Sequence, residues 1–297
     1  MNNNEEGGLS GPALAERAER IDAYSWFDQW SAAPGPVVQA LQLAAARHGE
    51  LRMVRSAVPF SHFNMVLTLG CPAPADDAAF AAIERFYAAQ AKRPHWVLVN
   101  DHTIPSDLPQ RLRERGYEPA GQWDRVVLQQ ATPERWAPFA SGCELVSGRT
   151  ASEWARFILA CYGMPPIIGE WLAALVGRPG WIHALRRDGG RPDGPITITR
   201  SLFYHAEGWA WLGIDAPVPG VMAPCFEDDQ RLVATLLTAA TRLGARRFVS
   251  DIEQPSPGRD NEAYRRWREL GFEPVYLRSL FMKVGYAHGS PQGRTDP

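Results

Sequence analysis

The sequence predicts an α+β protein built from two similar copies of one domain, on three observations. The chain has 297 residues, about twice the usual length of a single domain. In both halves, short apolar segments that suit strands alternate with longer segments of helical period. The segment RERGYEP at 113–119 also returns as RELGFEP at 268–274, 155 residues later. A period this long indicates a duplicated domain, because solenoid repeats recur about every 20–50 residues.

In the first half we expect four helices and three strands. Proline in the first turn and glycine past the last turn favour a helix that begins at Pro36 and ends before Gly49. Asp76 suits a helix start because the helix dipole favours negative charge there. The hydroxyl of Ser106 is a candidate cap for a helix that ends at Gly116. The expected helices cover 13–30, 36–48, 76–90 and 106–116, and the expected strands cover 63–69, 96–99 and 123–129.

The second half repeats the order strand, helix, strand, helix, strand. Its longest helix carries Leu232, Leu236 and Leu243 on one face. A stretch rich in Ala, Pro, Ser and Gly at 131–142 indicates the linker between the copies. The repeated elements are expected at 209–214, 227–243, 247–250, 260–270 and 275–284. Elements without a counterpart in the first half are expected as strands near 143–147, 181–187 and 195–204, and as helices near 152–162 and 168–177.

Composition excludes several classes of function. A formal net charge of −2 provides no general attraction for nucleic acid or for an anionic membrane. The first residues, MNNNEEGG, lack the basic and apolar segments of a signal peptide, and no run of 18 apolar residues is present, so we expect a cytoplasmic location. The four cysteines form no C-x-x-C pair and the seven histidines show no H-x-x-x-H spacing. We therefore expect reduced thiols and no metal. We also expect a monomer or homodimer.

The order strand, helix, strand, helix ending in Gly-Phe, strand resembles the C-terminal half of the GCN5-related N-acetyltransferase (GNAT) superfamily. Residues 141–284 resemble a complete GNAT domain, with a helix pair after the first strand and a hairpin before Trp209. Residues 13–140 resemble an abbreviated, degenerate copy. The resemblance implies two tandem GNAT-like domains, each a twisted mixed β-sheet flanked by helices. We expect the ends, 1–12 and 285–297, to be poorly ordered because they are rich in Asn, Gly, Ser and Pro.

The resemblance also implies an acetyl-CoA site, usually kept by one copy of such a pair. The strand at 209–214 would splay from its neighbour at a bulge, and the pantetheine would pair with the backbone of Leu212, Gly213 and Ile214. The pyrophosphate would lie at the start of the next helix, near Phe226 and Glu227. Free N–H groups and the helix dipole favour an anion at such a helix start.

The sequence departs from the family pattern at this helix start. The family has a glycine-rich loop there, whereas residues 222–229 contain no glycine. Glu227, Asp228 and Asp229 stand where a phosphate would bind. We expect these carboxylates to complement the helix dipole themselves and to repel a pyrophosphate.

A second departure concerns the catalytic groups. Trp267 stands where family members place a tyrosine that protonates the CoA thiolate, and it has no hydroxyl to do so. Tyr264, one turn earlier, is a candidate replacement, and the alternative is that it packs against the sheet. Asp251 and Glu253 follow the strand at 247–250 and are candidate general bases; the alternative for each is an ordinary solvated carboxylate.

Three further residues are candidates for the substrate cleft. Tyr204 and Trp211 lie on neighbouring strands, and by alternation Trp209 and Trp211 share one sheet face. These aromatic side chains either pack in the core or form a bulky wall that narrows the cleft or stacks a planar ligand. Glu170 begins a helix on the expected substrate side, and the alternative is that it only complements the helix dipole.

Two functions therefore compete. The first is a GNAT-type N-acetyltransferase that transfers an acetyl group from acetyl-CoA to a small-molecule or peptide amine. The second is a catalytically inactive tandem GNAT that serves as a ligand- or partner-binding module, which the acidic helix start and Trp267 favour. The resemblance in architecture favours the first.

Overall fold

The computed structural model describes residues 8–58, 60–90, 93–218, 222, 225–253 and 261–283. The predicted tail at 285–297 and most of the predicted tail at 1–12 lie outside the described residues. Helix α1 begins at Gly11, so the last two residues of the expected N-terminal tail are helical.

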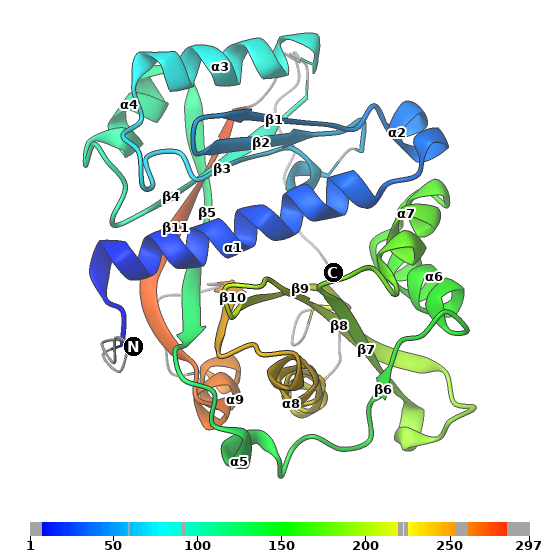
Figure 1. Cartoon of the computed structure of the whole chain (residues 1–297). Coiled ribbons are helices and arrows are strands. Elements are labelled where there is room, and N and C mark those ends of the chain that lie inside the picture. Colours follow the sequence, from blue (N-terminus) through cyan, green and yellow to red (C-terminus); the bar gives the residue numbers. More distant parts are fainter. Residues whose placement is uncertain are drawn as a thin grey trace.

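Eleven strands form one continuous mixed sheet in the order β1-β2-β3-β4-β11-β5-β10-β9-β8-β7-β6 (Figure 1). Only β3–β4 and β9–β10 pair in parallel within the described ladders. The strands are β1 Ala44–His48, β2 Leu51–Arg55, β3 Met65–Leu67, β4 His95–Asn100, β5 Tyr117–Leu128, β6 Glu144–Leu145, β7 Trp181–Arg187, β8 Ile196–Tyr204, β9 Trp209–Ala216, β10 Arg247–Glu253 and β11 Glu273–Lys283.

Helices pack on both faces of this sheet. Helices α5, α8 and α9 share one hydrophobic cluster, α3 and α4 share a second, and α1, α2, α6 and α7 share a third. The helices are α1 Gly11–Ala32, α2 Gly35–Leu41, α3 Asp77–Tyr87, α4 Leu108–Glu114, α5 Pro133–Trp136, α6 Ala151–Tyr162, α7 Ile167–Leu175, α8 Phe226–Arg242 and α9 Glu262–Leu270. The α+β fold class is therefore confirmed.

The two halves exchange their last strands. Strand β5 follows β4 along the chain, yet it pairs with β10 of the second half. Strand β11 follows β10, yet it pairs with β4 of the first half, and β5 and β11 pair with each other at the centre. Each half therefore completes the sheet of the other. The predicted domain boundaries, 13–140 and 141–284, stay a prediction.

The first half is less abbreviated than expected. The predicted helix at 36–48 ends at Leu41, and 44–55 form the hairpin β1–β2, in which Ala44 lies opposite Arg55. Three successive alanines favour a helix locally, but pairing with the buried strand β2 overrides that preference. This hairpin corresponds to β7–β8, so the expectation that the first half lacks such strands is wrong. Ser106 does not cap α4, which begins at Leu108.

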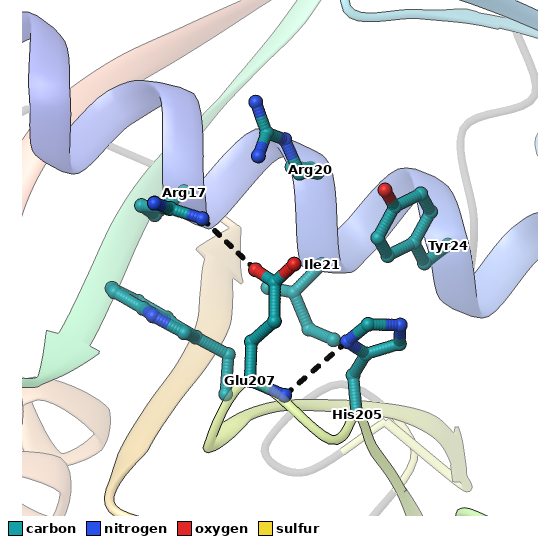
Figure 2. A pocket seen from close by; sticks show the side chains of 7 residues that line it. Arg17, Arg20, Ile21, Tyr24, His205 and Glu207 are labelled. Carbon is teal, nitrogen blue, oxygen red and sulfur yellow. Dashed lines mark hydrogen bonds and ion pairs between the residues drawn. The ribbon is translucent and has the colours of Figure 1, made fainter.

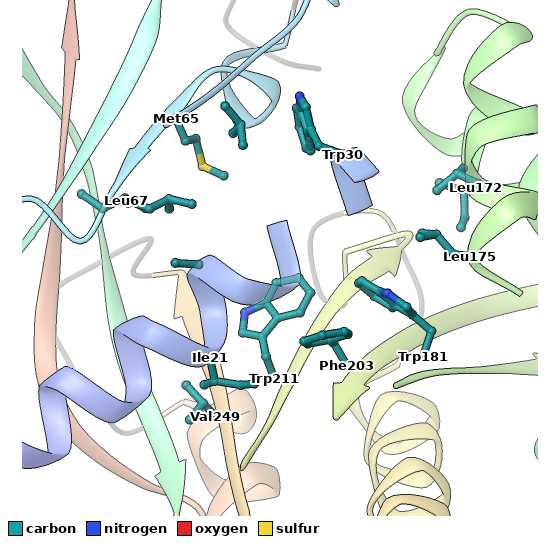
Figure 3. Close-up of a cluster of buried hydrophobic side chains, with 14 of the residues drawn as sticks. Ile21, Trp30, Met65, Leu67, Leu172, Leu175, Trp181, Phe203, Trp211 and Val249 are labelled. Atoms are coloured by element: carbon teal, nitrogen blue, oxygen red, sulfur yellow. The ribbon is translucent and has the colours of Figure 1, made fainter. Parts of the chain in front are cut away.

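Helix α1 belongs to the first half but packs against both halves. In Figure 1 it runs across the middle of the molecule, with β1–β3 on one side and β9 and β10 on the other. Its buried side chains Ile21 and Trp30 lie in one cluster with Met65 of β3 and Trp211 of β9 (Figure 3). One hydrophobic core therefore joins the two halves on this face of the sheet.

A buried network of charges lies between α1 and the exchanged strands. The guanidinium of Arg125 is 2.7 Å from Asp22, and that of Arg278 is 2.7 Å from Asp22 and 3.0 Å from Glu19. Asp251 of β10 lies 2.8 Å from Arg278 and 3.3 Å from Arg125. Burial by itself would raise the pKa of Asp22, but the two guanidinium groups lower it below its usual value. Two cations therefore hold three carboxylates together.

We expect Arg125→Met to lower the free energy of unfolding by about 3–5 kcal/mol, because it leaves buried carboxylates without one of their two cations. Denaturant unfolding measures the loss. Arg191→Met is the matched control, since the Arg191–Asp188 pair is 67% and 60% exposed and should contribute less than about 1 kcal/mol. Equal losses in the two variants would contradict a structural role for the buried network.

Candidate functional site

Strands β9 and β10 separate at one end. They pair in parallel at three positions, of which the last joins Trp211 to Val249, and no further pair joins them among the residues that the structure describes. This last pair is the vertex of the splay. Beyond it, β9 remains paired with β8, and β10 remains paired with β5. The ladder of β8 and β9 shifts register between Gly213 and Ala216, and Ile214 adopts a φ of 49°. The predicted splay and bulge are both present.

Leu212, Gly213 and Ile214 lie along the β9 side of this splay, where the resemblance placed the pantetheine. The side chain of Ser250, on β10, donates a hydrogen bond of 3.2 Å to the carbonyl oxygen of Leu212. This bond bridges the strands one residue past the vertex. Binding of pantetheine by these backbone groups stays a prediction.

The acidic start of α8 is neutralised by arginines. Glu227 lies 2.7 Å from Arg231 of the same helix, and the hydrogen bond from Arg231 lowers the pKa of Glu227. Asp228 lies 2.6 Å from an arginine of β7, and Asp229 lies 2.8 Å from an arginine of β8. These two strand residues are Arg186 and Arg200.

The expected repulsion of pyrophosphate by these carboxylates therefore needs correction. Each of the three carboxylates lies beside a guanidinium group, and Arg200 also lies 3.5 Å from Asp215. The ion pairs offset the negative charge at the helix start. Asp228 and Asp229 also point toward β7 and β8, which lie on the far side of β9 from β10. Phe226 is the first residue of α8. Residues 223 and 224 of the expected loop lie outside the described residues.

In the first half the corresponding edge of β3 is closed by a loop, although a hollow of about 140 Å³ lies nearby, between the β1–β2 turn, Gly70 and the start of α3. There β3 pairs with β4 at Met65 and Val66 and then ends. The amide of Ile104 donates to the carbonyl oxygen of Gly70 at 2.8 Å, and the amide of Ala75 donates to the carbonyl oxygen of Ile104 at 2.8 Å. The loop after β4 is thus bonded into the space that corresponds to the splay of β9 and β10. The side chain of Asp76 caps α3 at the amide of Ala79.

Of the two candidate bases, Asp251 lies in the charge network just past the vertex. Its side chain is 18% exposed, whereas those of Asp22 and Glu19 are 3% and 5% exposed. Burial raises the pKa of Asp251, and the two arginines oppose that shift. Glu253 lies opposite Trp123 in the β10–β5 ladder. The roles of both carboxylates stay predictions.

Tyr264 and Trp267 lie on the other face of the sheet, in the cluster with α8. Tyr264 is 1% exposed, and its hydroxyl donates a hydrogen bond to the buried carboxylate of Asp124. Trp267 packs edge-on against Phe272, and the guanidinium of Arg200 lies 5.4 Å from its ring. The hydroxyl of Tyr264 is thus already bonded in the core, and its role as a proton donor stays a prediction.

The three expected cleft residues do not come together. Trp211 stands at the vertex. Tyr204 pairs with Ala210 at the opposite, closed end of β9, and its hydroxyl lies near Gly244. Glu170 is exposed in the first turn of α7, where a carboxylate complements the helix dipole.

Three rings from the first half lie beside the splay and were missed from the sequence. His62 stacks on Trp123 at a centroid distance of 5.6 Å and meets Trp96 at 4.3 Å. Surrounding protein disfavours the charged imidazole and lowers the pKa of His62 to about 4, while the carboxylate of Asp215, near the end of β9, opposes this shift. Only the strand exchange brings Trp123 next to β10, so no local pattern could have indicated the group.

A separate hollow lies between α1 and the turn that joins β8 to β9 (Figure 2). The side chains of Arg17 and Glu207 bridge it at 2.9 Å. Its volume of about 10 Å³ suffices for roughly one water molecule, so it is too small for an acyl acceptor. Among the described residues, no group of three or more acidic, histidine or cysteine side chains could hold a metal. None of the described helices combines the length and apolar character needed to cross a membrane.

Several solved structures with a similar fold carry the names of acyltransferases. A GCN5-related N-acetyltransferase from Kribbella flavida matches 93% of this chain and 97% of its own, with a TM-score of 0.58 and 16% identity. The N-myristoyltransferase of Saccharomyces cerevisiae with bound myristoyl-CoA matches 92% and 80%, with a TM-score of 0.51 and 10% identity. A tandem GNAT protein from the clavulanic acid biosynthesis pathway matches 95% and 98%, with a TM-score of 0.49 and 16% identity. No protein-family model and no curated protein sequence matches the chain. The chain has the GNAT fold, as the resemblance implied.

We expect Asp229 to act as a structural residue. Asp229→Asn should lower the free energy of unfolding by about 3 kcal/mol, because it leaves the buried guanidinium of Arg200 without its nearest carboxylate. Glu227→Gln, at a carboxylate that is 51% exposed, should change it by less than about 1 kcal/mol. Chemical unfolding of both variants tests this. An unchanged free energy of unfolding in Asp229→Asn would show that the Arg200–Asp229 pair is dispensable.

Proposed function

We propose that the protein is an N-acyltransferase that binds acetyl-CoA in the splay between β9 and β10 and transfers the acetyl group to a small-molecule or peptide amine. The observation that carries this proposal is the separation of β9 from β10 after Trp211 and Val249, in a fold shared with acyltransferases. The loop that closes the β4-facing edge of β3 in the first half supports a site in the second half.

The donor would use backbone groups of β9 and the start of α8. Past the vertex, Leu212, Gly213 and Ile214 have no ladder pair with β10 among the described residues. The carbonyl oxygen of Leu212 accepts the hydrogen bond from Ser250, so a pantetheine would pair with the remaining β10-facing backbone groups. The amides at the start of α8 would take the pyrophosphate, supported by the helix dipole. The ion pairs of Glu227, Asp228 and Asp229 support this placement.

Transfer requires an unprotonated amine next to the thioester. The amine nitrogen gives up a proton and attacks the carbonyl carbon, the C–N bond forms as the C–S bond breaks, and the CoA thiolate leaves and takes up a proton. We assign the proton removal to Asp251, whose side chain is 18% exposed beside the vertex. Burial raises the pKa of Asp251, which makes its carboxylate a better proton acceptor. We assign no step to Tyr264, because its hydroxyl is buried and bonded to Asp124.

The acceptor would enter on the face of the sheet that carries Asp251. The rings of His62, Trp96 and Trp123 lie on the first-half side of this region. An ammonium group is attracted to the face of a tryptophan ring and to carboxylates. Together with Asp251 and Asp215, these rings suit an amine better than an anion. The acceptor is therefore proposed as an amine that contacts both halves.

A binding module without transfer activity is the second candidate. It is favoured by Trp267 at the position where the family carries a proton donor, and by the buried hydroxyl of Tyr264. A ligand- or partner-binding module does not require acetyl-CoA, so an acetyl-CoA titration and a transfer assay together separate the two candidates.

We expect acetyl-CoA to raise the melting temperature of the protein. A ligand present at 100 times its Kd adds about 2.7 kcal/mol of stability, and differential scanning fluorimetry with increasing acetyl-CoA measures the effect. Absence of a shift at millimolar acetyl-CoA would refute the proposed N-acetyltransferase and leave the ligand- or partner-binding module. A shift without acetylation of any amine in a broad panel would favour the binding module.

We expect Asp251→Asn to retain acetyl-CoA binding but to lose at least about 100-fold in kcat, the usual contribution of a general base. In the wild type the carboxylate must be ionised, so the rate should fall as pH drops through the raised pKa of Asp251. The variant should lack this acid limb. Arg191→Met serves as an exposed control with unchanged kinetics. An unchanged acid limb in Asp251→Asn would assign the base elsewhere.

A further inference from the structure

Trp211 occupies the vertex of the splay. It belongs to the last pair between β9 and β10, and its side chain points to the face that α1 covers. The indole extends along β9 and lies on the backbone of Gly213: a β-carbon added to Gly213 would be 2.0 Å from Cη2 of Trp211. The absence of a side chain at position 213 is therefore what allows the ring to lie against the strand.

Behind this ring the core is closely packed. The ring of Trp26, on α1, lies 6.1 Å from that of Trp211, and Ile21 and Val249 belong to the same buried cluster (Figure 3). Trp211 is 6% exposed. A group that reaches the vertex and continues toward α1 therefore meets aromatic and aliphatic side chains instead of a channel.

The direction of a bound donor follows from the chain. Helix α8 follows the far end of β9, so a donor with its pyrophosphate at the start of α8 runs back along β9 toward the vertex. Its acyl group then arrives beside Trp211. The yeast N-myristoyltransferase holds a long-chain acyl-CoA on the same fold, so the fold itself sets no short limit on the acyl chain.

We infer that Trp211, held against Gly213, restricts the acyl donor of this protein to short chains of about two to four carbons. The inference rests on the proposed function, because it concerns the donor bound in the same splay. A longer chain would have to displace a buried indole that α1 holds in place. Packing density in a protein core leaves no spare volume for added methylenes.

The test is a chain-length series of acyl-CoA binding, measured by isothermal titration calorimetry with acetyl-, butanoyl-, hexanoyl- and octanoyl-CoA. For the wild type we expect the affinity to fall at least 10-fold between acetyl- and octanoyl-CoA. Trp211→Ala should remove this preference by improving octanoyl-CoA binding at least 10-fold relative to acetyl-CoA. Trp211→Leu provides a better-packed variant if the alanine variant does not fold, and should give the same trend.

Trp209→Ala is the matched control. Trp209 lies on the same strand and the same face and is 5% exposed, but it pairs with Arg247 in the closed part of the ladder. Its removal should destabilise the protein without changing the chain-length preference. Gly213→Ala retains Trp211 but forces its indole away from the strand. This variant should also alter the chain-length preference.

The possible outcomes distinguish failure of the short-chain restriction from failure of the proposed function. Equal affinity of the wild type for acetyl- and octanoyl-CoA, with both bound, overturns this inference and leaves the proposed function intact. Equal changes of preference in Trp209→Ala and Trp211→Ala also overturn it, because the effect would then come from a loosened core. A wild type that binds no acyl-CoA of any length overturns the proposed function and this inference together.

Discussion

Two arginines at the centre of the sheet hold the molecule together. Arg125 comes from the last strand of the first half and Arg278 from the last strand of the second, and both bind Asp22 of α1 and Asp251 of β10. A buried charge is tolerated only where partners compensate its desolvation. The exchange of strands, the path of α1 and the position of Asp251 are thus mutually dependent. A displacement of any of these elements would leave a charge buried without a counterion.

The same network connects stability to the proposed chemistry. Asp251 is the network member with the largest solvent contact, so it is the point at which the buried charges meet the splay. Its protonation is set by burial and by arginines from both halves. The first half, whose corresponding edge of β3 is closed by the loop at Ile104, therefore still contributes to the site of the second through Arg125, through α1 and through the rings beside β10.

Local patterns in the sequence predicted most elements and indicated the duplication, and the family resemblance implied the splay beside β9. Apolar patterning placed α8, β9 and β10 within a few residues, because β9 is buried along most of its length and α8 buries one apolar face. The hairpin β1–β2 was not predicted, since Ala44, Ala45 and Ala46 favour a helix until a neighbouring strand pairs with them. The partners of Asp228 and Tyr264 could not be predicted from the sequence. Arg186 and Asp124 are far away along the chain, and only the fold brings them close.

The strand exchange also sets an order of events during synthesis. Strand β4 is complete at Asn100, but its neighbour β11 begins only at Glu273. At a translation rate of about 5–20 residues per second, roughly 10–30 s separate the two on the ribosome. During that interval β4 presents an unpaired backbone edge, which is prone to join the wrong chain. The nascent polypeptide thus depends on shielding, by its own compaction or by chaperones, until its last strand emerges.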